Sequence, residues 1–145
     1  MPDKQVHARP ARLDDSSHVW PLVHEFATSF DAEREAFDVA WPQLVDVPDT
    51  LVLVAETAAG KVVGYLLANS HLAFHANGRI AWVEEITVDA RRRHSGVGRL
   101  LMEHAERWAR SVGAAYIALA TRRAAPFYLA LDYEESAVYF KKPLT

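Results

Sequence analysis

The stretch from residue 86 to residue 99 constrains the fold more than any other part of the chain. It reads Ile-Thr-Val-Asp-Ala-Arg-Arg-Arg-His-Ser-Gly-Val-Gly-Arg. Its β-branched start favours a strand, and Gly96 and Gly98 indicate a turn. After the turn, apolar residues recur at helical spacing. They are Val97, Leu100, Leu101, Ala105, Trp108, Ala109 and Val112. The pattern predicts a strand, a glycine turn and a long amphipathic helix, in that order.

Such a turn suits an anionic ligand. The first backbone N–H groups of a helix have no intrahelical partner, and they lie at the positive end of the helix dipole. Glycines let an anion approach the backbone closely. Arg91, Arg92, Arg93 and Arg99 add positive charge around the turn. We therefore expect a phosphate or pyrophosphate here. The loop lacks the Gly-Lys-Ser/Thr of a P-loop and the third glycine of the dinucleotide fingerprint.

The remaining periodicity predicts a mixed α/β sheet with a right-handed crossover around the long helix. Strands are expected over residues 6–12, 50–57, 61–70, 80–88 and 116–120, with one or two closing strands within 133–142. Helices are expected over a segment with Val19, Leu22, Val23, Phe26 and Phe30 on one face, and over 32–41, 97–112 and 124–131. Pro42 should break or kink the second helix, and residues 71–79 should form a loop. Gly64, inside a strand, predicts a bulge or a close backbone approach.

Composition narrows the class of protein. The chain has 145 residues, half of them apolar, which fits one domain. The net charge of −3 argues against general nucleic-acid binding. The absence of cysteine excludes disulfides, thiolate metal sites and a cysteine nucleophile, and is compatible with a cytoplasmic location. No membrane span is expected. His71 and His75 are more typical of solvated or packed residues than of metal ligands.

Charge is distributed unevenly along the sequence. Residues 91–123 contain eight arginines against Glu103 and Glu106, whereas residues 31–49 contain six acids against Arg34 alone. The basic region suits an anion, and the acidic region suits a cation. Alternatively, both the basic and the acidic region could be ordinary solvent-exposed surfaces without a ligand.

Three segments together resemble the GCN5-related N-acetyltransferases (the GNAT superfamily). Arg93-x-x-Gly96-x-Gly98 is similar to that family's acetyl-CoA pyrophosphate loop. Residues 82–88, Trp-Val-Glu-Glu-Ile-Thr-Val, resemble its fourth strand, whose exposed backbone pairs with pantetheine amides. Residues 124–133 resemble its Ala-x-x-Phe-Tyr-x-x-x-Gly-Phe segment, with Asp132-Tyr133 in place of Gly-Phe. Because aspartate tolerates a left-handed C-cap, the turn can survive this departure.

The resemblance implies a fold and a cosubstrate. The expected fold is a single N-acetyltransferase domain over residues 1–145, with a GNAT-like mixed, mostly antiparallel β-sheet and helices on both faces. Its acetyl-CoA-binding half would span about 80–142, and its acceptor-site elements about 16–48 and 70–79. The resemblance implies acetyl-CoA as cosubstrate and no metal. The implied cofactor-binding residues are Ile86, Thr87, Val88, Arg93, His94, Ser95, Gly96, Val97, Gly98 and Arg99.

Acetyl transfer to an amine sets chemical requirements of its own. The amine must be uncharged, the thioester carbonyl polarised, and the departing thiolate protonated. By the match, Tyr128 is the tyrosine that meets the cofactor sulfur. Glu84 and Glu85 are candidate proton acceptors, but neighbouring residues of a strand point to opposite faces, so at most one should reach the acceptor. The sequence leaves the choice open, with a slight preference for Glu84. Trp41 is expected near the acceptor.

The favoured reading is an acetyl-CoA-dependent N-acetyltransferase acting by direct transfer. The acceptor is expected to be a primary amine of a small molecule or peptide, and the acidic segment suits a cationic one. A homodimer is compatible with the expected closing strands. The alternative is a non-catalytic acyl-CoA-binding or regulatory module on the same fold, because fold and function separate easily.

Overall fold

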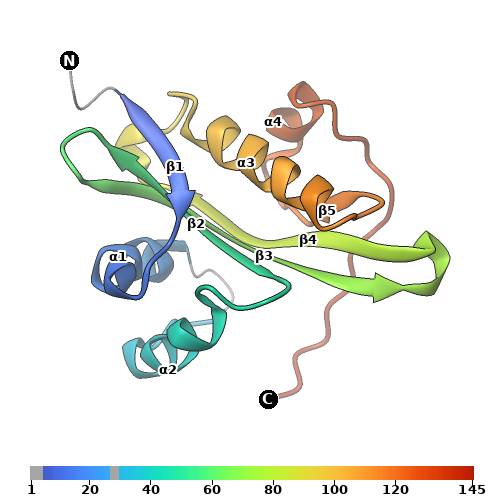
Figure 1. The fold of residues 1–145 in the computed structure, drawn as a ribbon, viewed down its shortest axis with the longest axis horizontal. Coiled ribbons are helices and arrows are strands. Elements are labelled where there is room, and N and C mark those ends of the chain that lie inside the picture. Colours follow the sequence, from blue (N-terminus) through green and yellow to red (C-terminus); the bar gives the residue numbers. More distant parts are fainter. Residues whose placement is uncertain (1–4, 27–29) are drawn as a thin grey trace.

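A five-stranded sheet lies between two layers of helices (Figure 1). The computed structural model describes residues 5–26 and 30–145. Helices α3 (Val97–Ser111) and α4 (Ala125–Ala130) lie on one side of the sheet, and α1 (Ser16–Phe26) and α2 (Arg34–Leu44) lie on the other. The predicted mixed sheet with helices on both faces is confirmed.

The strands follow one another across the sheet in chain order. They are β1 (Val6–Pro10), β2 (Thr50–Thr57), β3 (Val62–Ala73), β4 (Gly78–Val88) and β5 (Ile117–Leu119). The first three pairings are antiparallel, and β4 pairs with β5 in parallel. A parallel pair needs a crossover connection, which α3 supplies, as the strand–turn–helix pattern predicts.

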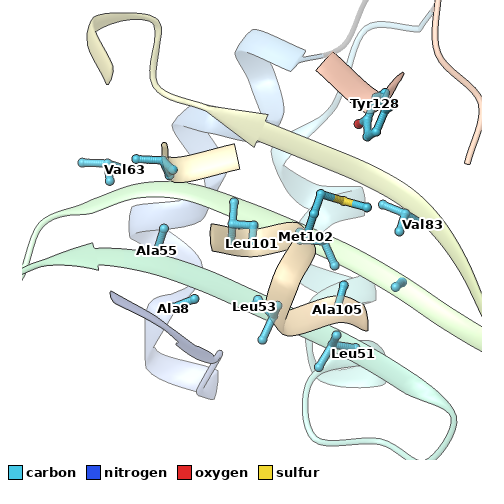
Figure 2. Close-up of a cluster of buried hydrophobic side chains, with 13 residues drawn as sticks. Ala8, Leu51, Leu53, Ala55, Val63, Val83, Leu101, Met102, Ala105 and Tyr128 are labelled. Carbon is cyan, nitrogen blue, oxygen red and sulfur yellow. The ribbon is translucent and has the colours of Figure 1, made fainter. Parts of the chain in front are cut away.

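Each face of the sheet carries its own hydrophobic cluster. On one face, Leu101, Met102 and Ala105 of α3 pack on strand residues and on Tyr128 of α4 (Figure 2). On the other face, Val19 and Leu22 of α1 pack with Trp41, Val54 and Tyr65, among other residues. The two clusters fix which side of each strand faces α3 and which faces α1 and α2.

Two bulges interrupt the strand register. Ala55 pairs with Gly64 and Glu56 with Val62, which leaves Val63 unpaired. Likewise Leu67 pairs with Glu85 and Ala68 with Val83, which leaves Glu84 unpaired. An extra residue of this kind bends and twists a strand, often beside a functional site.

Gly64 is also a point of close approach. A Cβ there would lie 3.0 Å from the Thr87 carbonyl oxygen and 3.3 Å from side-chain atoms of Val97 and Leu101. The glycine therefore lets the first turns of α3 pack directly on the sheet. Both features predicted for Gly64, a bulge and a close backbone approach, are therefore present at this part of β3.

Two connections differ from expectation. The loop expected over 71–79 is wrong. Strand β3 runs on to Ala73, β4 already begins at Gly78, and a short turn at Phe74–Ala76 lies between them. The expected break at Pro42 is also wrong, since α2 continues to Leu44. Pro42 lies in the last turns of the helix, and the Val45 N–H still bonds the Trp41 carbonyl at 3.0 Å. Residues 27–29, between Phe26 and Phe30 of the expected first helix, lie outside the described residues.

The closing strands expected within 133–142 are wrong as well. Residues 134–145 form no helix or strand and are exposed. This tail runs from α4 past the β5 edge to the α1/α2 side of the sheet (Figure 1). Tyr139 stacks on Trp82 there, and Lys141 lies over Phe30. The alternating apolar pattern suits a strand, but a strand forms only where another lies alongside, and β5 is three residues long.

Candidate functional site

The loop between β4 and α3 is held in a defined shape. The Asp89 carboxylate accepts a hydrogen bond from the Arg91 backbone N–H at 3.0 Å, and this bond holds the pKa of Asp89 below its ordinary value. His94 has φ 62° and Gly96 has φ 91°, both in the left-handed region. The Ser95 hydroxyl donates to the Arg92 carbonyl. The predicted glycine turn therefore ends directly at the first turn of α3.

The start of α3 presents free backbone donors. The first backbone bond of the helix runs from the Leu100 N–H to the Gly96 carbonyl at 3.0 Å. The N–H groups of Val97, Gly98 and Arg99 precede it and have no carbonyl within the helix. A Cβ on Gly96 would meet nothing within 4 Å, so a ligand can reach this backbone. A shallow depression of about 550 Å³ adjoins the loop, lined by Val6, Arg92, Ser95, Gly96, Val97 and Leu100.

Arginine charge adds to this positive end. Arg91 lies 3.5 Å from Asp89 and Arg99 lies 3.2 Å from Glu103, each as an exposed ion pair. Arg93 is exposed and forms no ion pair with any residue that the structure describes. Exposed pairs are weak and exchange easily with an incoming anion. The loop can therefore bind an anion through backbone donors and arginine side chains together.

Beside this loop the sheet opens. β4 and β5 pair only at residues 81–83 of β4, where Val83 faces Leu119. Beyond that point, the β5 side of Glu84–Val88 has no strand partner among the described residues. The opening begins at the unpaired Glu84. Unpaired N–H and C=O groups along such an edge are available to an extended polar ligand.

Tyr128 shares a hydrophobic cluster with Val83, the last paired residue before this opening. It is 8% exposed, and its ring packs edge-on against Phe127 at 4.9 Å and Tyr133 at 5.7 Å between centroids. Figure 2 shows it reaching the hydrophobic cluster from α4. Burial raises the pKa of its hydroxyl, which therefore stays protonated at neutral pH. That hydroxyl forms no hydrogen bond within the part of the chain that the structure describes.

Phe127 connects the glycine loop to Tyr128. A Cβ on Gly98 would lie 3.2 Å from the Phe127 Cζ atom, so the glycine makes room for this ring. α4 can thus pack against the first turn of α3. The residues expected in the loop and in the Phe-Tyr segment come together at this contact.

The two candidate carboxylates lie in different surroundings. Glu84 is the bulge residue and is exposed. Glu85 is half-buried and accepts a hydrogen bond of 2.7 Å from the Tyr65 hydroxyl, on the face of the sheet that α1 and α2 cover. Thr87 is buried and pairs with Tyr65. Ile86 and Val88 pack against the cluster on the opposite face.

Other candidate residues have structural roles. Trp41 is 7% exposed, and its indole N–H donates to the Leu13 carbonyl at 3.0 Å, so it is part of the core; its expected place near the acceptor stays a prediction. His75 bonds the Tyr116 hydroxyl at 2.9 Å. Among residues 5–26 and 30–145, no group of three or more His, Cys, Asp or Glu side chains could hold a metal ion.

Sequence reasoning missed Tyr65 and Phe127. Tyr65 is a single tyrosine in an aliphatic strand, and only the bulged register brings it to Glu85. Phe127 belongs to the quoted Phe-Tyr segment, but its contact with Gly98 depends on how α4 docks. Neither residue has a local signal that could have identified it.

Comparison with known proteins agrees with this geometry. The sequence model of the acetyltransferase (GNAT) family matches residues 16–133. The chain belongs to the acetyltransferase (GNAT) family. The resemblance stated from the three motifs is thereby confirmed. No curated protein sequence matches this GNAT-family chain closely enough to count as a relative.

Solved structures share the GNAT fold over nearly the whole chain. Glucosamine-6-phosphate N-acetyltransferase from Arabidopsis thaliana has a TM-score of 0.85 at 18% identity, covering 97% of this chain and 99% of its own. An aminoglycoside antibiotic 6'-N-acetyltransferase from Acinetobacter baumannii has a TM-score of 0.76 at 21% identity, covering 97% and 100%. An aminoglycoside N-acetyltransferase in complex with CoA has a TM-score of 0.84 at 17% identity, covering 97% and 96%. In this GNAT-family chain, none of the described helices has the length and apolar character needed to cross a membrane.

Proposed function

We propose that this protein is an acetyl-CoA-dependent N-acetyltransferase that moves an acetyl group directly to a primary amine. One arrangement carries the proposal: it combines an anion-binding helix start, a parted strand edge on β4, and Tyr128, which packs in the cluster that β4 residues line and contacts the helix start through Phe127. A long ligand with a phosphate at one end and amides along its arm matches the first two. A reacting sulfur beside Tyr128 matches the third.

The residues present fit acetyl-CoA. The loop from Arg93 to Arg99, with Gly96 and Gly98 as its open positions, would hold the pyrophosphate. The free edge of β4 at Ile86, Thr87 and Val88 would hold the pantetheine amides through backbone groups. Acetyl-CoA supplies the activated acyl group as a thioester. The solved neighbour with bound CoA supports this assignment by its fold.

Two side-chain functions complete the reaction. The amine nitrogen attacks the thioester carbonyl, the carbon–sulfur bond breaks, and the acetyl group stays on nitrogen. Tyr128 would donate its proton to the leaving thiolate, which its buried, protonated hydroxyl allows. Glu84 or Glu85 would accept the proton that the amine loses, directly or through water.

An acetyl-CoA consumption screen tests this function. Its panel should contain simple amines, polyamines, amino sugars, aminoglycosides and peptides, since the solved neighbours are named for glucosamine-6-phosphate and aminoglycosides. We expect turnover that needs both acetyl-CoA and a primary amine. Tight CoA binding without turnover on any amine would instead identify a non-catalytic acyl-CoA-binding module. Homodimer formation and a cytoplasmic location stay predictions.

Replacing Gly96 by valine tests the cofactor loop. The side chain would enter the space that the pyrophosphate needs, and we expect acetyl-CoA binding to weaken at least ~10-fold, a scale of ~1.4 kcal/mol, in calorimetry. Valine is also strained at φ 91°. Gly60→Val is the matched control, because Gly60 has φ 88° and equally open surroundings in the β2–β3 turn. Equal affinities in the two folded variants would place the cofactor elsewhere.

A further inference from the structure

The Tyr65–Glu85 pair is a feature that the cofactor site does not use. Tyr65 is 2% exposed, and its hydroxyl donates to the Glu85 Oε1 atom at 2.7 Å. Burial and the neighbouring Glu85 charge raise the pKa of Tyr65, so its proton stays in place. A buried donor that cannot ionise fixes the orientation of the carboxylate it bonds.

Glu85 nevertheless lacks a positive partner. No Lys, Arg or His of the described residues lies within ion-pair distance of it. Tyr65 is a neutral donor, so the negative charge stays uncompensated on a face that α1 partly covers. A half-buried carboxylate of this kind suits a cation supplied from outside the chain.

Two further polar groups on the same face, an amide oxygen and a hydroxyl, lack a close hydrogen-bond partner within the described residues. Asn69 lies on the face of β3 that carries Tyr65 and Leu67, because side chains alternate along the strand. The buried Asn69 Oδ1 atom has no hydrogen-bond partner within the described residues. Thr87, directly opposite Tyr65, is 8% exposed, and its Oγ1 atom makes no close hydrogen bond there, although its hydroxyl lies near enough to the Tyr65 hydroxyl to lower that residue's pKa slightly. Buried acceptors without donors cost free energy, and a ligand with several N–H groups would satisfy them.

An aromatic surface adjoins these acceptors. Trp82 pairs with Asn69 across the β3–β4 ladder. Tyr139 of the tail stacks on Trp82, with 6.4 Å between ring centroids and 19° between ring planes. Aromatic faces attract cations and pack against apolar parts of a ligand. The face therefore offers oxygen acceptors for an ammonium group and rings for the carbon skeleton that carries it.

We propose that Glu85, held in place by the Tyr65 hydroxyl, binds the ammonium group of the acceptor, and that Glu84 does not. This inference rests on the proposed function, and it assigns Tyr65 as a positioning residue. The acceptor class is a primary ammonium, whose three N–H donors suit Glu85 and the unpartnered acceptors beside it. Glu84 has no such surroundings, since it is exposed at the bulge and forms no side-chain hydrogen bond or ion pair within the described chain.

The test measures binding rather than turnover. The full-length protein, loaded with CoA, is titrated by calorimetry or NMR with 2-phenylethylamine and with its neutral counterpart 2-phenylethanol. We expect the amine to bind more tightly than the alcohol, with a Kd in the millimolar range. Glu85→Gln should weaken amine binding at least about 10-fold and leave alcohol binding unchanged. Tyr65→Phe should weaken amine binding about 3- to 10-fold, because the carboxylate loses its fixed orientation.

Glu84→Gln is the matched control, since it removes the same charge one residue away and should change the amine Kd less than about 2-fold. The ratio of amine to alcohol affinity separates positioning from a structural defect, because a distorted site would weaken both probes together. If Tyr65→Phe does not fold, Glu85→Gln carries the test. Wild-type protein that binds the two probes equally, or a loss that follows Glu84→Gln instead, would overturn the proposal. Because no acetyl transfer is measured, the two failures can be told apart: an active enzyme that does not prefer the amine would overturn this inference alone, whereas an inactive protein that still prefers the amine would refute the proposed function and leave only an ammonium-binding site at Glu85.

Discussion

The hydroxyl of the buried Tyr128 side chain determines what this residue can contribute to catalysis. Burial raises the pKa of the Tyr128 hydroxyl, which has no hydrogen-bond partner in the described chain and is therefore free to donate a proton in the proposed reaction. Tyr128→Phe keeps the ring contacts with Phe127 and Tyr133. We therefore expect little change in stability and a fall in kcat of about 10²-fold, with the acetyl-CoA Kd unchanged.

The same burial gives Tyr128 a signature in the pH profile. A raised pKa keeps the hydroxyl protonated through its ordinary value near 10, so its deprotonation should cause no alkaline loss of kcat below about pH 10. Steady-state kinetics of wild type and Tyr128→Phe, with melting curves for both, check these expectations. An unchanged kcat where chemistry limits the rate would make Tyr128 a packing residue. A much lower melting temperature would identify a structural hydroxyl.

Asp15 carries a stability role at the same scale. It is 5% exposed and accepts bonds of 2.8 and 2.9 Å from Arg9, which also contacts Glu56 at 2.6 Å. The Arg9 bonds hold the pKa of Asp15 below its ordinary value. Its contribution to stability is therefore complete above the unfolded pKa, near 4, and is lost as the pH falls through the lower folded value.

Asp15→Asn should lower the free energy of unfolding by about 3 kcal/mol at neutral pH, because it breaks a buried ion pair. Urea titrations from pH 7 to pH 3 should show this difference shrinking below about pH 4. Asp14→Asn, at a fully exposed neighbour, should change stability by less than about 0.5 kcal/mol. A difference between wild type and Asp15→Asn that stays constant down to pH 3 would contradict the assigned pKa direction.

At the scale of elements, glycines set how α3 meets its neighbours. Gly64 allows α3 to lie on β3, and Gly98 allows α4 to lie on α3 through Phe127. In Gly98→Ala the new methyl group should displace the Phe127 ring by a few tenths of an ångström and shift Tyr128 with it. We expect kcat to fall about 10-fold, since small displacements of catalytic groups are costly.

The stability of Gly98→Ala should change little, because the roughly 1 kcal/mol that alanine gains over glycine in helix propensity offsets the cost of displacing the Phe127 ring. Phe127→Leu added to Gly98→Ala removes the ring atom in conflict and should recover part of kcat. Calorimetric stability and steady-state kinetics of the single and double variants check this pair. A double variant no faster than Gly98→Ala would show that the Phe127 contact does not position Tyr128.

Helices and strands could be predicted from the sequence where residues close together in the chain set the hydrophobic pattern. The β2 strand, the α3 helix and the glycine turn between β4 and α3 follow from residues that are neighbours in sequence. The end of the β3–β4 hairpin and the tail depended on whether a strand partner is present rather than on residue pattern alone, and there the prediction was wrong. The Glu84 bulge has the same origin, because only the partner strand defines it. The sequence motifs therefore suffice to propose the loop and Tyr128 as site residues, whereas the Tyr65–Glu85 contact can be seen only from the strand register.

Across the whole molecule, positive charge gathers around the proposed cofactor loop and negative charge around the proposed acceptor-site elements. The arginines lie around the cofactor loop, and the acids of residues 31–49 lie in and beside α2 on the opposite side of the sheet. Two of those acids are paired, Asp38 with Arg34 at 3.0 Å and Asp49 with Arg79 at 3.1 Å. Asp31, Glu33, Glu35 and Asp46 are exposed and form no ion pair within the described residues. The acidic excess therefore remains after pairing.

This excess predicts a cationic acceptor whose KM depends on salt. Exposed charges act over about a Debye length, ~10 Å at 0.1 M, so added salt should weaken the attraction. We expect the KM of the best amine to rise about 2- to 5-fold between 20 and 200 mM NaCl, with kcat nearly unchanged. Asp31→Asn combined with Glu33→Gln should raise KM at low salt and flatten its salt dependence. The same charge change at Glu134 and Glu135 in the tail is the control and should leave the slope closer to wild type. A neutral or anionic best substrate, or a KM independent of salt, would refute the role of the acidic segment while leaving the acetyltransferase assignment intact.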